Sequence, residues 1–307
     1  MRTAFFRALL EVAHEDERVM LVVGDLGFGV VEPFQEHYPE RFVNAGVAEQ
    51  NMTGIAAGLA LCGNVVFTYS IANFPTLRCL EQIRNDVCYH KADVTIVAVG
   101  GGFAYGSLGM SHHATEDIAI MRALPNMTVL APGDPVEAAA ATHAIIEEPG
   151  PCYLRLGRAG GQVVHHEPID YRIGKSIRLR EGHDLTLIST GDLLPTAVAA
   201  ADELAAIGIT VRLLSMHTVK PLDTDAVLGA AHETGAIATF EEHSVLGGLG
   251  GAVAEVLAEC DDVNVPFNRI GVPSTFATIA GDQEYLRASF GLSTDSVVKR
   301  LVKLVKE

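Results

Sequence analysis

The chain has 307 residues, of which 49% are hydrophobic, so it can bury more than one sizeable core. Its formal net charge is −16, and its lysines and arginines form no cluster in the sequence. This balance disfavours nucleic acid and anionic membrane surfaces as partners. Length and composition therefore predict an acidic globular protein with two domains.

The N-terminal sequence and the cysteines predict a cytoplasmic protein. Arg7 interrupts the short apolar run near the start, and acidic residues follow within a few positions, unlike a secretory signal. No apolar run approaches the roughly 20 residues that a membrane helix needs. The five cysteines include no C-x-x-C pair and are interpreted as reduced thiols.

The first half of the chain alternates apolar runs of strand length with longer helical stretches. The predicted strands are residues 18–26, 65–70, 93–100, 127–132 and 152–157. The predicted helices are residues 49–62, 73–90, 115–124 and 135–147. The strand runs are nearly continuous in Val, Ile and Leu, as in strands covered by helices on both faces. This pattern predicts a doubly wound parallel sheet.

A second series of the same kind follows. Its predicted strands are residues 184–190, 210–216, 236–242 and 267–272, and its predicted helices are residues 194–207, 223–234, 248–259 and 294–306. The region between the two series is rich in polar residues and Gly. We therefore predict an α/β protein with a first domain at 1–165, a linker at 166–182 and a second domain with a mostly parallel sheet at 183–307.

Glu49 begins a predicted helix that is rich in Gly and Ala. Composition alone favours close helix packing, with Glu49 as a first-turn carboxylate that the helix dipole stabilises by about 0.3–1 kcal/mol. The alternative is a buried acid that handles a proton. Asp192 follows another predicted strand, where open α/β sheets tend to place ligands.

From Gly46 to Arg158 the sequence resembles the pyrimidine-binding domain of transketolases. The motifs occur in the family's order: GVAEQNM at 46–52, IANF at 71–74, GMSHHATED at 109–117 and LRLGRAG at 154–160. The stretch EEHSVLGGLGG at 241–251 resembles the family's C-terminal domain. This resemblance implies two doubly wound α/β domains and thiamine diphosphate as the cofactor.

By position, Glu49 matches the family's catalytic glutamate, which hydrogen-bonds the aminopyrimidine ring of the cofactor. A carboxylic acid that shares a proton with a ring nitrogen drives the tautomer change that the cofactor needs. Burial among small apolar residues should favour the protonated acid.

Phe74 matches the aromatic residue that stacks on the same ring. The spacing from Phe74 to Arg78 differs by one residue from the family pattern, so Phe67 and Tyr69 remain competitors for this role. Ile71 stands where relatives often have a second Phe, and it is included among the cofactor-binding candidates.

His112 matches a histidine near the diphosphate and the substrate hydroxyls, where it can donate to a developing oxyanion or relay a proton. His113 is a weaker substrate-binding candidate. Arg158 matches the arginine that grips the substrate's phosphate, or it pairs with a surface acid. Leu108 stands where the family has an aspartate that binds the donor sugar, and Gly100 stands where it often has a phosphate-binding histidine. Both departures put the usual ketose phosphate specificity in doubt.

The family binds magnesium diphosphate through Gly-Asp-Gly followed by Asn, and this chain has no Gly-Asp-Gly. The resemblance therefore implies that a separate N-terminal subunit supplies the diphosphate-binding domain and the magnesium ligands, with none from this chain. The implied assembly is a heterotetramer of two plus two subunits.

Three functional hypotheses follow. The first is the C-terminal subunit of a split transketolase, which transfers a two-carbon ketol unit from a ketose or its phosphate to an aldose or its phosphate. The second is the beta subunit of a 2-oxo acid dehydrogenase. The third is a non-catalytic remnant that binds a partner, which the presence of Glu49 disfavours.

Overall fold

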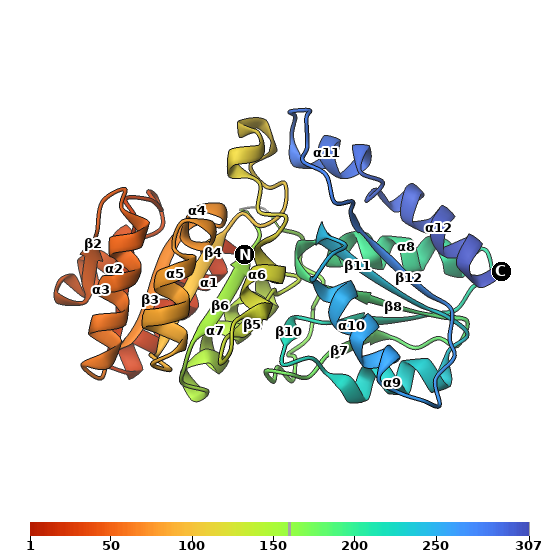
Figure 1. Cartoon of the computed structure of the whole chain (residues 1–307), viewed down its shortest axis with the longest axis horizontal. Helices are drawn as coiled ribbons and strands as arrows, with labels where there is room; N and C mark the ends of the chain where they lie inside the picture. The colour runs from red at the N-terminus through yellow and green to blue at the C-terminus, as the bar shows by residue number, and fades with distance from the viewer. Residues whose placement is uncertain (159–160, 307) are drawn as a thin grey trace.

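The computed structural model describes residues 1–158 and 161–306. The chain forms two α/β domains that lie side by side, each built on one sheet (Figure 1). The first sheet has seven strands in the order β10-β5-β6-β4-β3-β1-β2, and the second has five in the order β12-β11-β8-β9-β7. Two α/β domains with mostly parallel sheets confirm the predicted fold class.

The first sheet is parallel except at one edge. Its strands from the first half of the chain are β1 (Val19–Val23), β2 (Phe42–Asn44), β3 (Val65–Ile71), β4 (Val94–Val99), β5 (Thr128–Leu130) and β6 (Cys152–Leu156). Strand β10 (Thr218–Lys220) comes from the second half of the chain and pairs antiparallel with β5. The second half of the chain therefore completes the first sheet.

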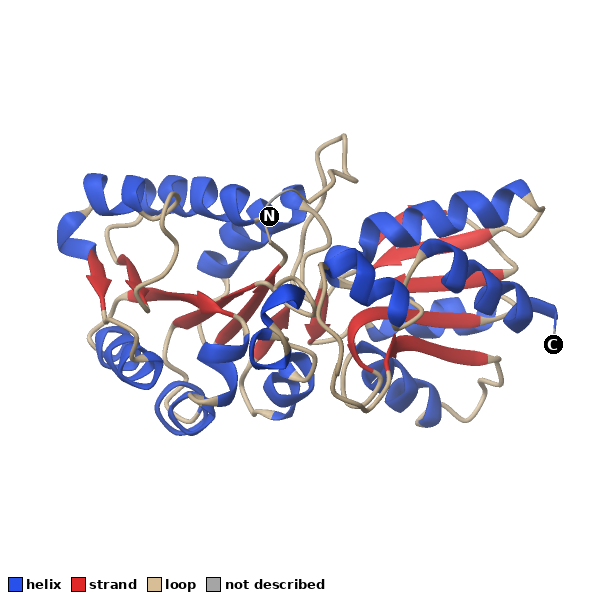
Figure 2. Cartoon of the chain, turned by 90° about the horizontal axis from the view of Figure 1, so that it is seen from above, coloured by secondary structure: helices blue, strands red, loops and turns tan. Residues whose placement is uncertain are grey.

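Helices cover both faces of this sheet (Figure 2). They are α1 (Arg2–Glu15), α2 (Glu32–His37), α3 (Glu49–Leu61), α4 (Asn73–Leu77), α5 (Leu80–Gln82), α6 (Asp117–Ala123) and α7 (Pro135–Glu147). Helices α1 and α7 pack on one face, whereas α3 and α6 bury side chains against the other. Successive strand residues point to opposite faces, so both faces of each strand are apolar.

Several features of the first domain differ from the prediction. Helices α1 and α2 and strand β2 were not predicted. The predicted helix at 73–90 is interrupted, because α4 and α5 are followed by a π-helical turn at Ile83–Cys88.

The second domain follows the same plan. Its strands are β7 (Ile177–Arg180), β8 (Leu185–Ser189), β9 (Val211–Ser215), β11 (Ile237–Ser244) and β12 (Phe267–Val272). Its helices are α8 (Leu194–Ala206), α9 (Thr224–Glu233), α10 (Leu249–Ala258), α11 (Gln283–Ser289) and α12 (Thr294–Lys306). Strand β7 lies inside the predicted linker and pairs antiparallel with β9, so the later part of that segment contributes to the second sheet.

Within the described residues, no helix combines the length and the apolar character that crossing a membrane requires.

Candidate functional site

The residues singled out in the sequence gather at one edge of the first sheet. Glu49 begins α3, Phe74 lies in α4 directly after β3, Gly100 follows β4 and Arg158 follows β6. Because the carboxyl ends of parallel strands meet at one edge, residues far apart in the sequence come together there. His112 ends a short 3-10 turn at Met110–His112, in the yellow segment that rises above the junction between the domains (Figure 1).

The Glu49 side chain is 1% exposed, and only one of its two carboxylate oxygens accepts a hydrogen bond from a described residue. The Arg78 guanidinium donates to Oε2 at 2.8 Å, whereas Oε1 is buried and meets no hydrogen-bond partner among the described residues. The buried Ser70 hydroxyl also lacks such a partner, and a methyl group built on Gly24 would lie 3.6 Å from Glu49 Cγ and 3.7 Å from Ser70 Oγ. Glu49 is buried as predicted, but its surroundings are not wholly apolar, because the Arg78 guanidinium contacts the carboxyl group.

Arg78 and Phe74 together connect Glu49 to His112. The Arg78 guanidinium that binds Glu49 lies 4.7 Å from the centre of the Phe74 ring. The opposite contact is edge-on, with the His112 ring centre 5.1 Å from that of Phe74. We call Glu49, Phe74, Arg78 and His112 the acid–aromatic cluster.

The other cofactor-binding candidates lie outside this cluster. Phe67 is fully buried on the α1 side of the sheet, where its ring centre lies 6.1 Å from that of Phe5. Tyr69 has the same orientation, because residues two apart in a strand share a face. Ile71 is the half-buried last residue of β3.

The adjacent histidines have different surroundings. His112 contacts Phe74, and its Nδ1 lies 3.1 Å from the Ser111 hydroxyl. His113 is 5% exposed and packs edge-on against Phe103, and burial lowers its pKa. Phe103 in turn stacks on Phe290 of the second domain. The structure therefore brings His112, and not His113, to the acid–aromatic cluster.

Tyr105 fills the space beside Gly100. Gly100 has a φ of +83°, and a Cβ built there would lie 2.1 Å from Tyr105 Cε2. The Tyr105 ring centre lies 6.5 Å from that of His112, and the Arg158 guanidinium lies 5.2 Å from the Tyr105 ring centre. Tyr105 thus connects two predicted site residues. Leu108, by contrast, is 54% exposed on a neighbouring turn.

Gly100→Ala should destabilise the chain more than Gly109→Ala. Both glycines have a positive φ, but a Cβ at Gly109 meets no described heavy atom within 4 Å. Alanine therefore adds backbone strain at both positions and a collision with Tyr105 at Gly100 alone. Overpacking of this kind costs about 1–3 kcal/mol. Equal losses of unfolding free energy in denaturant titrations of the two variants would contradict the close packing of Tyr105 on Gly100.

Arg2 is a further cation at this edge that the sequence did not reveal. Burial raises the pKa of Tyr69, although the nearby positive charge of Arg2 opposes this shift. Burial likewise raises the pKa of Tyr105, and the charges of Arg158 and Arg2 oppose it. Neither arginine forms an ion pair with another described residue. Arg2 and Arg158 are far apart in the sequence. They come close because the start of the chain packs against the residues that follow β6.

A cavity of about 380 Å³ lies beside Arg158, between the two domains. Asp192, Gln283 and Arg287 of the second domain line its opposite wall. Burial alone would raise the pKa of Asp192, but the charges of Arg287 and Arg155 outweigh this effect and hold the pKa below its usual value. Asp192 therefore faces a cavity, as its position after a strand suggested, but it is already paired with Arg287 at 3.0 Å.

Comparison with known proteins identifies the relationship behind this arrangement. The family model of the transketolase pyrimidine binding domain matches residues 1–162, and that of the transketolase C-terminal domain matches residues 174–297. The chain belongs to the transketolase family. Both domains and their order agree with the resemblance that the sequence motifs indicated, and the family implies thiamine diphosphate as the cofactor.

The similar proteins include subunits of split transketolases. The putative transketolase C-terminal section of Methanocaldococcus jannaschii is 40% identical over 310 residues, covering 100% of this chain and 96% of that protein. The 6-deoxy-6-sulfo-D-fructose transketolase subunit SqwH of Clostridium sp. (strain MSTE9) is 39% identical over 97% of this chain and 92% of its own length. A solved split gene transketolase, an inactive beta4 tetramer, is 39% identical with a TM-score of 0.90 and covers 99% of this chain and 97% of that chain. Over its length this chain thus corresponds to the C-terminal subunit of a split transketolase.

Proposed function

We propose that this transketolase subunit transfers a two-carbon ketol unit from a ketose or ketose phosphate to an aldose or aldose phosphate, and that it acts only with a separate diphosphate-binding subunit. The observation that carries the proposal is the acid–aromatic cluster. It places a buried acceptor oxygen of Glu49, an aromatic ring and a histidine side by side at the carboxyl edge of a parallel sheet.

The residues present fit the pyrimidine end of thiamine diphosphate. A buried acceptor without a partner costs free energy unless a ligand satisfies it, and Glu49 Oε1 is such an acceptor. Arg78 holds Oε2 and so orients the carboxyl group, while Phe74 offers a ring beside it. When bound, the cofactor would supply the nucleophilic carbon and the electron sink for the two-carbon unit.

The remaining residues suit a substrate with an anionic end. His112 is placed to donate a hydrogen bond to an oxygen that gains negative charge, or to move a proton at that oxygen. Arg158 lies over the Tyr105 ring, and Arg2 lies nearby, where it hydrogen-bonds the Tyr69 hydroxyl. Neither has a carboxylate partner among the described residues, and a guanidinium suits an anion. We propose that a phosphate or sulfonate lies between them. Tyr105 then contributes to specificity where Gly100 and Leu108 depart from the family.

The surface near the cluster suits a protein partner. Phe28, which follows β1 in the chain, is 71% exposed. Val47, two residues before the start of α3, is 75% exposed. Gly54 and Gly58 are exposed on α3, and a Cβ at either meets no described heavy atom within 4 Å, so another backbone can approach this helix. We propose that these surfaces are covered in a heterotetramer of two plus two subunits, with the partner supplying the magnesium ligands. Among the described residues, no three His, Cys, Asp or Glu side chains gather into a metal site.

The reaction is tested by mixing this chain with its diphosphate-binding partner, thiamine diphosphate and magnesium. Ketoses, ketose phosphates and ketose sulfonates serve as donors and aldoses or their phosphates as acceptors, with product formation followed by mass spectrometry. We expect ketol transfer by the mixture and none by either chain alone. Absence of transfer across the panel, together with acyl transfer from a 2-oxo acid to a lipoyl domain, would overturn the proposal in favour of a 2-oxo acid dehydrogenase subunit.

A further inference from the structure

The loop that carries His112 rises from a base formed by two backbone segments. Gly102 and Ala114 face each other at this base: Gly102 N–H donates to the Ala114 carbonyl at 2.8 Å, and Ala114 N–H donates back at 3.0 Å. Residues 103–113, including Tyr105 and His112, form the loop above it. We call these residues the His112 loop. From the α4 side, Asn73 Nδ2 donates to the Ser111 carbonyl at 2.7 Å.

The second domain holds the base of the His112 loop through the end of β11. Ser244 N–H donates to the Thr115 carbonyl at 2.7 Å, on one side of the base. Phe103 N–H donates to Glu242 Oε1 at 2.9 Å, on the other side. The backbone on both sides of His112, at Phe103 and at Thr115, is therefore hydrogen-bonded to the end of β11 in the second domain.

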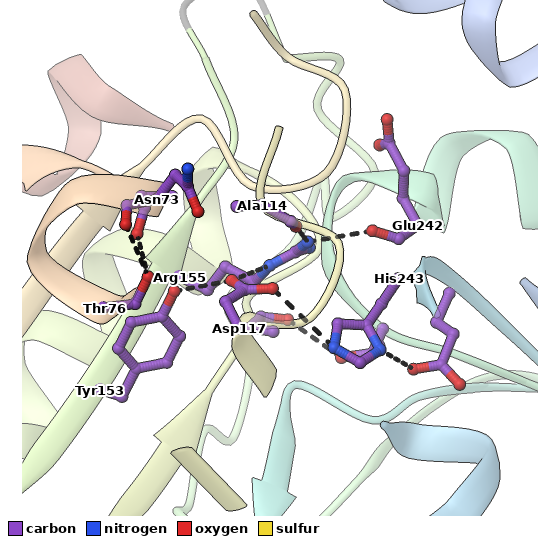
Figure 3. Close-up of polar contacts among 12 residues, drawn as sticks. Asn73, Thr76, Ala114, Asp117, Tyr153, Arg155, Glu242 and His243 are labelled. Atoms are coloured by element: carbon purple, nitrogen blue, oxygen red, sulfur yellow. Dashed lines mark hydrogen bonds and ion pairs between the residues drawn. The ribbon is translucent and has the colours of Figure 1, made fainter. Parts of the chain in front are cut away.

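Arg155 connects the same elements from below the loop. Its Nη2 donates to the Ala114 carbonyl at 2.9 Å and to the Glu242 carbonyl at 3.0 Å (Figure 3). Its Nε donates at 2.7 Å to Asp117, which also accepts a hydrogen bond from the Tyr153 hydroxyl at 2.6 Å. A buried charge with several partners has one favourable arrangement, so this network fixes the base of the loop relative to β11.

Glu242 is the residue of β11 best placed to transmit this constraint. Its side chain is 1% exposed, and its carboxylate is held within the second domain by Arg287 and by Gln283, whose Nε2 donates at 3.0 Å. The same carboxylate reaches across to Phe103, the first residue of the His112 loop. The figure shows the Glu242 backbone beside Arg155 and Ala114 (Figure 3).

We propose that Glu242 is a positioning residue for His112, through which the second domain holds the His112 loop against the acid–aromatic cluster. The expected effect of Glu242 on turnover rests on the proposed function, whereas its effect on the His112 loop does not. It gives the second domain a role in the reaction without requiring any of its residues to touch the substrate.

Hydrogen exchange of the chain alone tests the clamp without any activity measurement. Glu242→Ala removes the acceptor of the Phe103 N–H, and we expect backbone amides of residues 103–113 to exchange at least about tenfold faster. Glu284→Ala is the matched control, because Glu284 is 81% exposed and binds the same Arg287 at 3.0 Å without reaching the loop. Unchanged protection of residues 103–113 in Glu242→Ala, or an equal change in both variants, would overturn the proposal. If Glu242→Ala fails to fold, Glu242→Gln is measured instead. It keeps an acceptor for the Phe103 N–H but loses the negative charge that Arg287 binds, so residues 103–113 should exchange faster by a smaller factor, and unchanged protection would overturn the proposal.

A double-mutant cycle in the reconstituted complex tests the link to His112. A displaced catalytic group costs up to about 100-fold in rate, so we expect Glu242→Ala to lower kcat by about 10- to 100-fold with the affinity for thiamine diphosphate unchanged. Glu242→Gln keeps an acceptor for Phe103 and should recover part of the loss. In a His112→Ala background, Glu242→Ala should add little. Fully additive effects would overturn the positioning role. Absence of ketol transfer by the unmodified complex would defeat the proposed function, whereas the exchange measurement still decides the clamp.

Discussion

Glu49→Gln should lower the turnover of the reconstituted enzyme by about 10³-fold, within the range that a proton-handling side chain contributes. Glutamine keeps the size of the side chain and can still accept one hydrogen bond. It cannot hold and release the proton that the pyrimidine ring requires. The loss should therefore appear in kcat while the complex still assembles.

The matched control for this variant is Glu81→Gln. Glu81 is an exposed glutamate in α5, near Arg78 in the sequence but not part of the acid–aromatic cluster. Steady-state ketol transfer and analytical ultracentrifugation of both variants separate catalysis from assembly. Turnover of Glu49→Gln within a few-fold of the unmodified enzyme would defeat the assignment of Glu49.

Arg155→Met should destabilise the chain by about 3–5 kcal/mol, the usual result of breaking a buried ion pair from one side. Arg155 and Asp117 have side chains only 4% and 1% exposed. Removing the guanidinium leaves the Asp117 carboxylate buried and deprives the Ala114 and Glu242 carbonyls of their shared donor.

Denaturant titrations of the chain alone measure this effect. Arg178→Met is the control, because Arg178 pairs with Glu181 on the surface, and it should leave the free energy of unfolding nearly unchanged. Arg155→Met combined with Asp117→Asn removes both charges and should be more stable than Arg155→Met alone. A loss in Arg155→Met no larger than in the control would show that the network does not stabilise the junction.

The strands that build the sheets were predictable because each is a short, nearly continuous apolar run. The elements that escaped prediction lack that signature. Helix α1 lies at the start of the chain, where Arg7 interrupts the short apolar run. Strand β10 is three residues long, and its pairing partner β5 is about 90 residues away in the sequence. Its role depends on the docking of the domains, which a local pattern does not contain.

The residues of the candidate site that belong to sequence motifs could be predicted. Those whose position depends on tertiary packing could not. Glu49, Phe74 and His112 follow from their motifs, and the structure brings them together. Tyr105 has no motif, and its position depends on the absence of a side chain at Gly100. The surroundings of Phe67 follow from strand alternation once the register of β3 is known.

Binding of thiamine diphosphate tests the central claim most directly, namely that this chain supplies one side of a shared cofactor site. Calorimetric titrations with magnesium present would compare the chain alone, the diphosphate-binding partner alone, the mixture, and the mixture made with Glu49→Gln. We predict saturable binding by the mixture, weaker binding by the Glu49→Gln mixture and no comparable binding by this chain alone. Binding by the chain alone as tight as by the mixture, or a mixture indifferent to Glu49→Gln, would contradict the account.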